Sequence, residues 1–226
     1  APAGFFPFQK SGAHTARAVG LKLCDFQGLV APANLTVDVP ALLRACGLQA
    51  WHFDHLLEEQ ACLQPFHVSK SESAYVDLAA GSEAYLAGRR TAGAGWVSQV
   101  PRKARKMGRE VGELRFEYDT RDAGVLRQVL AWKSLQRQRT QTDDMLQRDW
   151  VQAAIERMLS THEEGFAGVL SALFAGSQLV AGHLGLRSHR TLHVWFPAFD
   201  LAYEKYSPGL VMFTEMFRAA AAAGIT

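Results

Sequence analysis

The stretch of sequence that decides the fold is YEKYSPG, residues 203–209, followed by the apolar segment 210–223. Ser207 is a residue type favoured at a helix N-cap, where its hydroxyl accepts a hydrogen bond from the first turn. Pro208 suits the first helical position, because the N–H that proline lacks would have no helical partner there. The stretch therefore predicts a helix that begins just after Ser207 and buries an apolar face.

The start of this helix has the features of an anion site. Gly209 has no Cβ, so a ligand can approach the backbone closely at this position. Lys205 lies just upstream, and the first turn contains no acidic residue. Unpaired N–H groups and the helix dipole attract phosphate. The same residues also describe an ordinary capped helix without a ligand, and that alternative stays open from the sequence alone.

The composition is that of a globular protein. The chain has 226 residues, of which 48% are hydrophobic and 20% charged, and this length suits one large domain or two small ones. The formal net charge of +2 predicts no polyanionic partner for the molecule as a whole, but the charge is distributed unevenly. Seven basic residues and no acidic one occur between positions 89 and 109: Arg89, Arg90, Arg102, Lys103, Arg105, Lys106 and Arg109.

Cysteine usage and hydropathy predict a cytoplasmic protein. Cys24, Cys46 and Cys62 are an odd, sparse set without CxxC spacing, which argues against a disulfide framework and fits a reducing compartment. No apolar run approaches the roughly 20 residues of a membrane-spanning helix. The start of the chain lacks the order of a signal peptide, in which basic residues precede an apolar run.

The histidines and cysteines predict no metal site. His52 and His55 are three residues apart in a predicted strand, so their side chains point to opposite faces. Cys62 and His67 have no partners at the spacing that zinc sites use.

The first 80 residues are predicted to form short strands around one short helix. Asp38 is suited to cap that helix, and Gly47 to end it. The strands are predicted at 5–9, 18–24, 50–56 and near 75–76, and the helix at 39–46.

The remaining chain is predicted to be helical first and then β-rich. A strand at 113–118 alternates Leu114, Phe116 and Tyr118. Two short polar segments separate three successive strands near the end, as hairpin turns do. The helices are predicted at 82–90, 96–111, 122–139 and 149–161, and the three late strands at 166–174, 178–186 and 191–199.

This order predicts an α+β fold with a mostly antiparallel sheet flanked by helices. The chain has no GxGxxG and no GxxxxGK[ST] segment, so neither a dinucleotide-binding nor a P-loop fold is indicated. We expect two related subdomains, 1–80 and 81–226, the first of them incomplete. Both ends look truncated, because the apolar segment 1–9 is already strand-like and 225–226 looks like the start of another strand.

Several segments together resemble the GNAT superfamily of acyltransferases. Within it they are most similar to acetyltransferases associated with bacterial cellulose and exopolysaccharide biosynthesis, which are relatives of the Fem-type peptidyltransferases. The resemblance depends on the order and spacing of the segments rather than on any single one. The segments are DFQG (25–28), the basic helix 102–109, KSLQ (133–136) with Arg139 and Thr140, VAGH (180–183), the strand 192–196, PAFD (197–200) and YSPG (206–209).

The resemblance implies acyl transfer from acetyl-CoA or another acyl-CoA, or from an acyl carrier protein, to an amine or hydroxyl of a small molecule or saccharide. In the superfamily the donor's pyrophosphate lies at the N-terminus of the helix that follows the central strand. Carried over, the backbone N–H groups of the non-proline residues there would hold it. This donor site comprises Lys205, Tyr206, Ser207, Pro208, Gly209 and Leu210. Family members usually continue into an Asp-Phe-Gly strand and a Tyr-Lys pair, which this sequence does not contain.

His183 is the first candidate for the base that such a transfer needs. It alternates onto the face opposite Val180 and Leu184, and a packed or solvent-facing histidine is the alternative. A two-residue turn at 188–189 would pair Leu184 with His193, whereas a three-residue turn could pair His183 with Trp195. A slip of one residue reverses every side chain, so the sequence leaves the register open.

Two further residues are candidates for the chemistry. Tyr203 could protonate the leaving thiolate, with Asp200 beside it; the alternative is a turn aspartate and a packing tyrosine. Candidates for substrate contacts are Lys133 and Gln136, which share a helix face, Trp195 on the last strand, and Asp25, which could instead cap its own loop.

The basic helix 102–109 has three interpretations. It could be a solvated face, a docking face for an acidic carrier protein or the 3′-phosphate of CoA, or a nucleic-acid surface. The only nearby aromatic residue is Trp96, so a base-stacking surface is poorly supported. Two alternative functions therefore accompany the main one: a non-catalytic module that binds a carrier protein or polyanion, and a Fem-like transferase that uses aminoacyl-tRNA.

Overall fold

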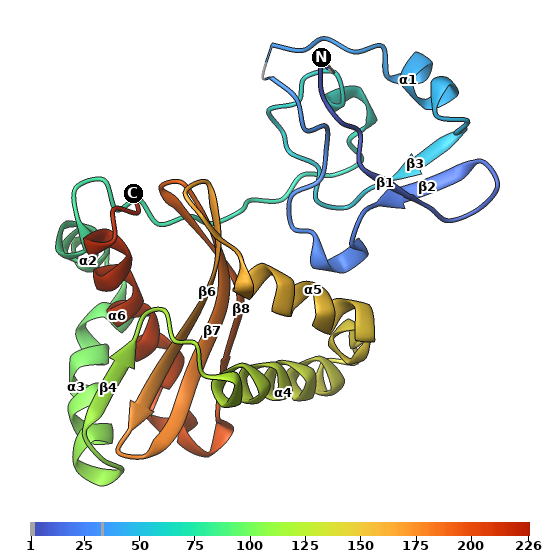
Figure 1. The fold of residues 1–226 in the computed structure, drawn as a ribbon. Coiled ribbons are helices and arrows are strands. Elements are labelled where there is room, and N and C mark those ends of the chain that lie inside the picture. Colours follow the sequence, from blue (N-terminus) through green and yellow to red (C-terminus); the bar gives the residue numbers. More distant parts are fainter. Residues whose placement is uncertain (1–2, 33) are drawn as a thin grey trace. The chain divides into compact units, whose positions relative to one another are not determined.

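A computed structural model describes residues 3–32 and 34–226, and the chain divides into two compact units, Ala1–Ala74 and Tyr75–Thr226 (Figure 1). The first two residues of the apolar segment 1–9 lie outside the described residues. Each unit is described by itself below. That the first unit is a GNAT-like subdomain stays a prediction.

The first unit holds a small three-stranded sheet. Its middle strand pairs antiparallel with one neighbour and parallel with the other. The side chain of Asp38 caps the only α-helix of the described part of this unit, accepting a hydrogen bond from the Ala41 N–H at 3.1 Å, as expected. The elements are β1 (Phe8–Lys10), β2 (Thr15–Ala18), β3 (Ala50–His52), α1 (Val39–Ala45) and the 3₁₀ turns η1 (Leu21–Leu23) and η2 (Gln64–Phe66).

Two glutamine side chains hold the loops of the first unit together. Buried Gln27 donates from Nε2 to Asp54 Oδ1 at 2.5 Å and accepts at Oε1 from the Asp54 N–H at 3.0 Å. Gln60 bonds both backbone groups of Leu29, at 2.8 and 2.7 Å. The loop that carries Asp25 is therefore fixed by amide side chains together with an isolated backbone bridge between Gln27 and Leu56.

The second unit is built on an antiparallel sheet in the order β4-β6-β7-β8. A short strand, β5, pairs with the start of β6. Short apolar runs separated by small or polar turn residues explain why these strands form consecutive hairpins. The strands are β4 (Leu114–Glu117), β5 (His162–Glu163), β6 (Phe166–Ala175), β7 (Gln178–Ser188) and β8 (Thr191–Phe199).

Helices cover both faces of this sheet (Figure 1). A Cβ at Gly182 would lie 2.3 Å from Val129 Cγ2, so that face packs against α4. On the opposite face Ala181 joins a buried cluster with Met107 and Met212. The first face carries α4 (Ala123–Arg139) and α5 (Asp149–Ser160), and the second carries α3 (Gly95–Glu110) and α6 (Pro208–Ala222), with α2 (Ser82–Thr91) packed against them.

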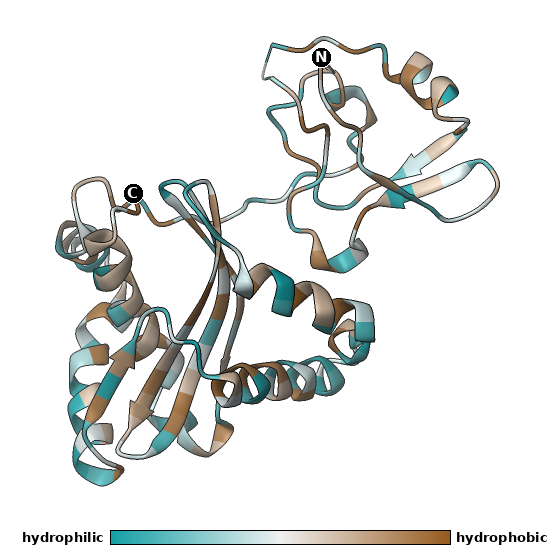
Figure 2. Ribbon diagram, viewed as in Figure 1, coloured by the Kyte–Doolittle hydropathy of each residue, from teal (hydrophilic) through white to brown (hydrophobic). Residues whose placement is uncertain are grey.

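The two-sided cover explains the hydropathy of the strands. Figure 2 shows β6 predominantly hydrophobic, while much of the outward surface of α3 is hydrophilic. Most of the residues of β6 are buried, and both alternating sets contribute to this burial. The α+β architecture with an antiparallel sheet flanked by helices is therefore confirmed.

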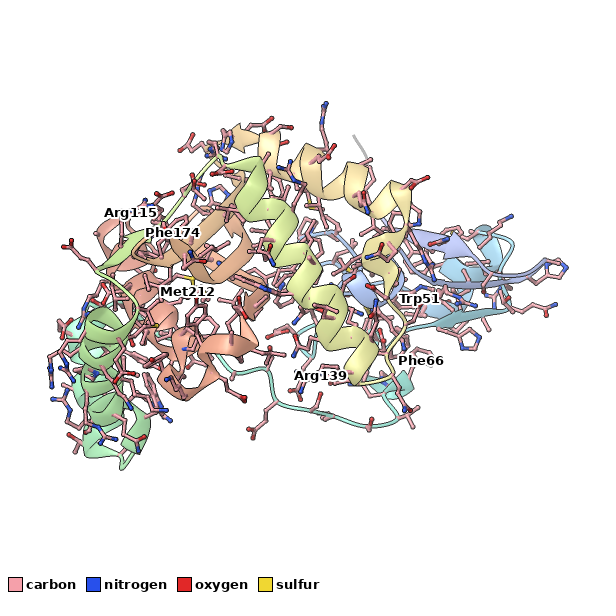
Figure 3. All side chains as sticks on the ribbon, turned by 90° about the horizontal axis from the view of Figure 1, so that it is seen from below. Trp51, Phe66, Arg115, Arg139, Phe174 and Met212 are labelled. Carbon is pink, nitrogen blue, oxygen red and sulfur yellow. The ribbon has the colours of Figure 1, made fainter. Side chains whose placement is uncertain are left out.

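The edge strand β4 is held to its neighbour by side chains as well as by the ladder. The guanidinium of Arg115 lies 4.3 Å from the ring centroid of Phe174 on β6 (Figure 3), and Arg115 also pairs with Glu117. Such a cation–π contact stabilises an exposed site by about 0.5–1 kcal/mol.

Two strand predictions in the first 80 residues are wrong. The predicted strand 18–24 is displaced: β2 ends at Ala18, and Gly20, with φ +78°, turns the chain into η1. The predicted strand near 75–76 is extended chain without a strand partner. Val76 and Leu78 instead pack against a buried cluster that includes Ala220 of α6.

In the part of the chain that the structure describes, no helix is both long enough and apolar enough to cross a bilayer.

Candidate functional site

The candidate site lies where β8 turns into α6. The backbone N–H of Asp200 donates to the Val180 carbonyl at 3.0 Å, which continues the pairing with β7. The Asp200 carboxylate accepts from the Ala202 N–H at 2.9 Å and so caps the 3₁₀ helix η4 (Leu201–Tyr206). The predicted catalytic role of Asp200 is not supported by this geometry, because the carboxylate is engaged as a cap.

Tyr206 anchors the end of η4. Its ring is buried, and its hydroxyl donates to Glu110 Oε2 of α3 at 2.6 Å. This hydrogen bond, together with Lys106 and Lys205, holds the pKa of Glu110 below its ordinary value. Lys205 Nζ lies 3.7 Å from the same oxygen and 4.7 Å from the Tyr206 ring centroid, and its pKa is raised chiefly by Tyr206. The side chain of Tyr206 thus anchors the turn, and the assignment of Tyr206 to the donor site stays a prediction.

Ser207 precedes α6 in a left-handed backbone conformation, with φ 52° and ψ 54°. Its side chain makes no capping hydrogen bond, contrary to the N-cap prediction. Instead Ser207 Oγ accepts a hydrogen bond from Lys103 Nζ of α3 at 2.5 Å. A left-handed residue cannot place its hydroxyl as an extended N-cap does, which explains the difference.

Most of the backbone donors predicted to be free at this turn are occupied. The Ser207 N–H donates to the Glu204 carbonyl at 2.8 Å, and the Leu210 N–H donates to the Ser207 carbonyl at 3.0 Å. Pro208 has no N–H. Within the described chain the Gly209 N–H has no intramolecular partner. The prediction of several free amides therefore reduces to one, at Gly209.

Space is open at Gly209 on the side where a Cβ would lie. A Cβ built on Gly209 would meet only Phe199 Cδ1, at an ordinary 3.5 Å. Leu210 next to it is exposed, and the first turn of α6 holds no acidic residue. The Gly209 N–H, the helix dipole and the ammonium of Lys103 at Ser207 thus favour an anion here.

Tyr203 lies in η4, and its ring packs against the buried cluster that contains Met107 and Met212. Its N–H donates to the Asp200 carbonyl at 3.0 Å. Its assignment as a proton donor stays a prediction.

His183 does not have the environment of a general base. Its side chain is fully buried on β7, between Ser171 of β6 and Pro197 of β8, and neither ring nitrogen has a hydrogen-bond partner. Burial, with His193 nearby, lowers the pKa of His183 from 6.5 to about 3. A Cβ at Gly185 would lie 2.5 Å from His183 Cε1, so the ring occupies the space beside this glycine. The predicted catalytic role is not supported, because the ring is sealed from solvent and its lowered pKa makes it a weak base.

Neither expected register of the last hairpin is correct. The turn is His189–Arg190, with His189 at φ +48°, and Leu186 pairs with His193. A bulge then makes Leu184 pair with Phe196, so that Trp195 is the extra residue of β8. The Trp195 ring stacks on Phe196, with centroids 4.3 Å apart. Bulges are frequent next to active sites, where they redirect a side chain.

The predicted substrate contacts are not gathered at the start of α6. Lys133 is half-buried and Gln136 exposed on α4, which covers the face of the sheet opposite α6. Asp25 lies half-buried in the first unit. Their roles as substrate contacts stay predictions.

Sequence reasoning missed the contact of Lys103 with Ser207, treating the lysine as one of seven similar basic residues. A signal was present. The buried residues of α3 include Val100 and Met107, and Lys103 follows the first by three positions and precedes the second by four. Helical spacing therefore places Lys103 next to the inward stripe.

No group of three or more His, Cys, Asp or Glu side chains within residues 3–32 and 34–226 is arranged to hold a metal ion.

Comparison with known proteins gives one result, which agrees with this architecture. A family model described as an acetyltransferase (GNAT) domain matches residues 97–226, from within α3 to Thr226, beyond the end of α6. No curated protein and no solved structure matches significantly. The matched segment contains β4, β6, β7, β8 and the turn into α6, and exceeds half of the chain. On this basis the chain belongs to the GNAT acetyltransferase family.

Proposed function

We propose that this protein transfers an acyl group from acyl-CoA to an amine or hydroxyl of a small-molecule or saccharide acceptor. The observation that carries the proposal is the free N–H of Gly209 at the start of α6, within a segment that matches the GNAT domain. GNAT domains typically use acetyl-CoA.

In this proposal the phosphate of the donor binds at the Gly209 N–H. The positive end of the α6 dipole favours the negative charge, and exposed Leu210 leaves the approach open. The prediction that Gly209 contacts the donor is retained, with Ser207 beside it. Buried Pro208 positions the turn, and exposed Lys205 adds positive charge.

The transfer needs no covalent enzyme intermediate. The acceptor nitrogen or oxygen attacks the thioester carbonyl, the C–S bond breaks, and the thiolate takes up a proton as the acceptor loses one. Holding the two substrates side by side supplies much of the rate enhancement. Tyr203 is our proposed proton donor to the thiolate, because it lies in η4 between the end of β8 and the donor turn.

The acceptor is proposed to bind near the bulge of β8. Trp195 is the extra residue there, and α4, which carries Lys133 and Gln136, packs against β8. Trp195 therefore lies on the strand against which the helix of Lys133 and Gln136 packs. The proposals for Asp25 and for a role in exopolysaccharide or cellulose biosynthesis rest on the resemblance alone. A cytoplasmic location is proposed because Cys24, Cys46 and Cys62 are all free thiols.

Calorimetric titration of the protein with CoA and acetyl-CoA tests the proposal. We expect a dissociation constant of tens of micromolar or tighter, which corresponds to about 6 kcal/mol or more. No heat and no thermal shift at millimolar CoA would overturn it.

A second candidate function, recognition of an acidic acyl carrier protein, is favoured by the exposed cations of α3. Arg102, Arg105 and Arg109 are exposed, and within the described chain none of them has a carboxylate within 4.0 Å. Replacing all three by glutamine should abolish binding of an acidic carrier protein while CoA binding survives. Unchanged carrier binding would remove this candidate.

A further inference from the structure

We propose that Lys103 is the residue that makes the site specific for a phosphorylated donor, by binding the donor's phosphate together with the Gly209 N–H. This inference rests on the proposed function, because it assigns a residue to the same donor site. Lys103 comes from α3, which precedes the first strand of the sheet, and reaches a turn 104 residues later in the chain.

The position of Lys103 is built into the core of the second unit. Its helix packs against α6, and the neighbouring inward residues Val100 and Met107 are buried at 3% and 0% exposure. Lys103 itself is half-buried, and its ammonium contacts Ser207 at the residue before α6. The positive charge of Lys103 is therefore held in one place at the donor turn, whereas the ammonium of an exposed surface lysine can take many positions.

Within the described part of the chain, the charge of Lys103 has no anionic partner. Its hydrogen-bond acceptor is the neutral hydroxyl of Ser207, and no carboxylate of the described residues lies within 4.0 Å of it. The carboxylate nearest in the same helix, Glu110, is already shared by Tyr206, Lys106 and Lys205. A half-buried ammonium that faces only a hydroxyl retains its attraction for an anion, and a charge-assisted bond to phosphate is about twice as strong as a neutral one.

The turn can present three donor groups to one phosphate. Lys103 uses one N–H on Ser207 and keeps two. Ser207 accepts that bond with a lone pair, so its own O–H remains a donor. Gly209, two residues on, contributes its free backbone N–H. We infer that a phosphate oxygen bound at Gly209 lies within reach of the ammonium and the hydroxyl as well.

This arrangement defines the class of donor. CoA and dephospho-CoA both carry the diphosphate next to pantetheine, whereas acetyl-pantetheine carries no phosphate. Lys103 therefore strengthens binding of the first two and contributes nothing to the third.

The test compares Lys103→Met with Lys103→Arg and the control Lys106→Met by calorimetry with CoA and dephospho-CoA. We expect Lys103→Met to weaken both ligands about 10- to 100-fold, the range for losing a charge-assisted hydrogen bond. Lys103→Arg should recover part of the loss because it restores the charge. Lys106→Met removes a cation of the same helix that pairs with Glu110 instead of contacting Ser207. It should change the affinity for CoA less than about threefold.

A purely structural role of Lys103 is distinguished by the phosphate-free donor. The KM for acetyl-pantetheine, with each variant's melting temperature recorded, should be the same for the wild-type protein and Lys103→Met. Equal losses with acetyl-pantetheine and acetyl-CoA would overturn the inference, and so would unchanged CoA affinity in Lys103→Met. If the wild-type protein binds no CoA at all, the proposed function fails first, so the two failures are distinguishable.

Discussion

At the scale of single residues, substitutions of Gly209 should change the affinity for CoA without lowering the stability of the protein. Gly209→Glu places a carboxylate at the proposed phosphate position and should lower CoA affinity at least 100-fold. The same charge lies at a helix N-terminus, where it stabilises by about 0.3–1 kcal/mol, so the melting temperature should not fall.

Gly209→Ala is the matched control. The added Cβ has ordinary contact with Phe199 at 3.5 Å, and alanine is a better helix former than glycine. We expect CoA affinity within threefold of the wild type and a gain of about 0.5 kcal/mol in the free energy of unfolding. Equal CoA affinity in the alanine and glutamate variants would exclude the donor site from this turn.

His183 predicts a pH dependence of stability. Its pKa in the folded protein, about 3, lies below its ordinary value of 6.5. As the pH falls below 6.5 the unfolded state binds a proton that the folded state does not, so stability is lost with decreasing pH. Between pH 7 and pH 5 this histidine should cost about 2 kcal/mol of the free energy of unfolding. Urea titrations of the wild type and His183→Leu at both pH values measure it; an identical pH dependence of the two proteins contradicts the assignment.

The contacts of an individual residue were predictable where neighbouring backbone determines them. They were not predictable where elements distant in the sequence meet. The cap at Asp38 depends on neighbouring backbone and was predicted correctly. Ser207 and His183 were not, because Lys103 comes from another helix and because helices cover both faces of β7. Single-residue patterns contain no information on which element lies over a face.

At the scale of elements, the approach of α5 to β6 depends on one glycine. A Cβ at Gly168 would lie 2.6 Å from Leu159 Cα and from the Met158 carbonyl oxygen, so the backbone of the helix itself must move. Gly168→Ala should therefore lower the free energy of unfolding by about 1–3 kcal/mol.

Gly88→Ala is the control in an exposed helix. Nothing lies within 4 Å of a Cβ at Gly88 in α2, so the substitution should raise the free energy of unfolding by about 0.5–1 kcal/mol. Chemical denaturation of both variants measures the difference. Equal effects of the two substitutions would mean that α5 does not pack on Gly168 as described.

Helices and strands with regular apolar spacing and clear turn residues at their ends were predicted well from the sequence. The helices of the second unit and the strands β6, β7 and β8 lie where apolar spacing and turn residues placed them. The register of β7 with β8 was not predictable, because the bulge at Trp195 inserts a residue that alternation does not reveal. The first unit was harder, since its strands are only three or four residues long.

At the scale of the whole molecule, the segment that joins the two units should be the first point of proteolysis. Tyr75 is 86% exposed in a stretch without regular secondary structure, and Val68 is 99% exposed. Limited chymotrypsin treatment should cleave after Tyr75 before any site in the sheet of the second unit. Mass spectrometry identifies the cut, and Tyr75→Ser should delay it; a first cut within β6, β7 or β8 would contradict the division.

The order of elements was sufficient to predict the architecture of the second unit, because helices followed by hairpins and a further helix allow few packings. The sequence predicted where the turn before α6 lies, and the role of this turn as the donor site stays a proposal. Only the fold shows that Gly209 keeps the free amide and that α3 supplies a lysine there.

The most direct measurement of the central claim is the amide resonance of Gly209 in ¹H–¹⁵N spectra during titration with CoA. The account predicts a saturable downfield shift of this proton as it bonds to phosphate, while the amide of Gly182, buried beneath Val129, stays unchanged. A Gly209 resonance that does not move at saturating CoA, while resonances elsewhere do, would contradict the donor site.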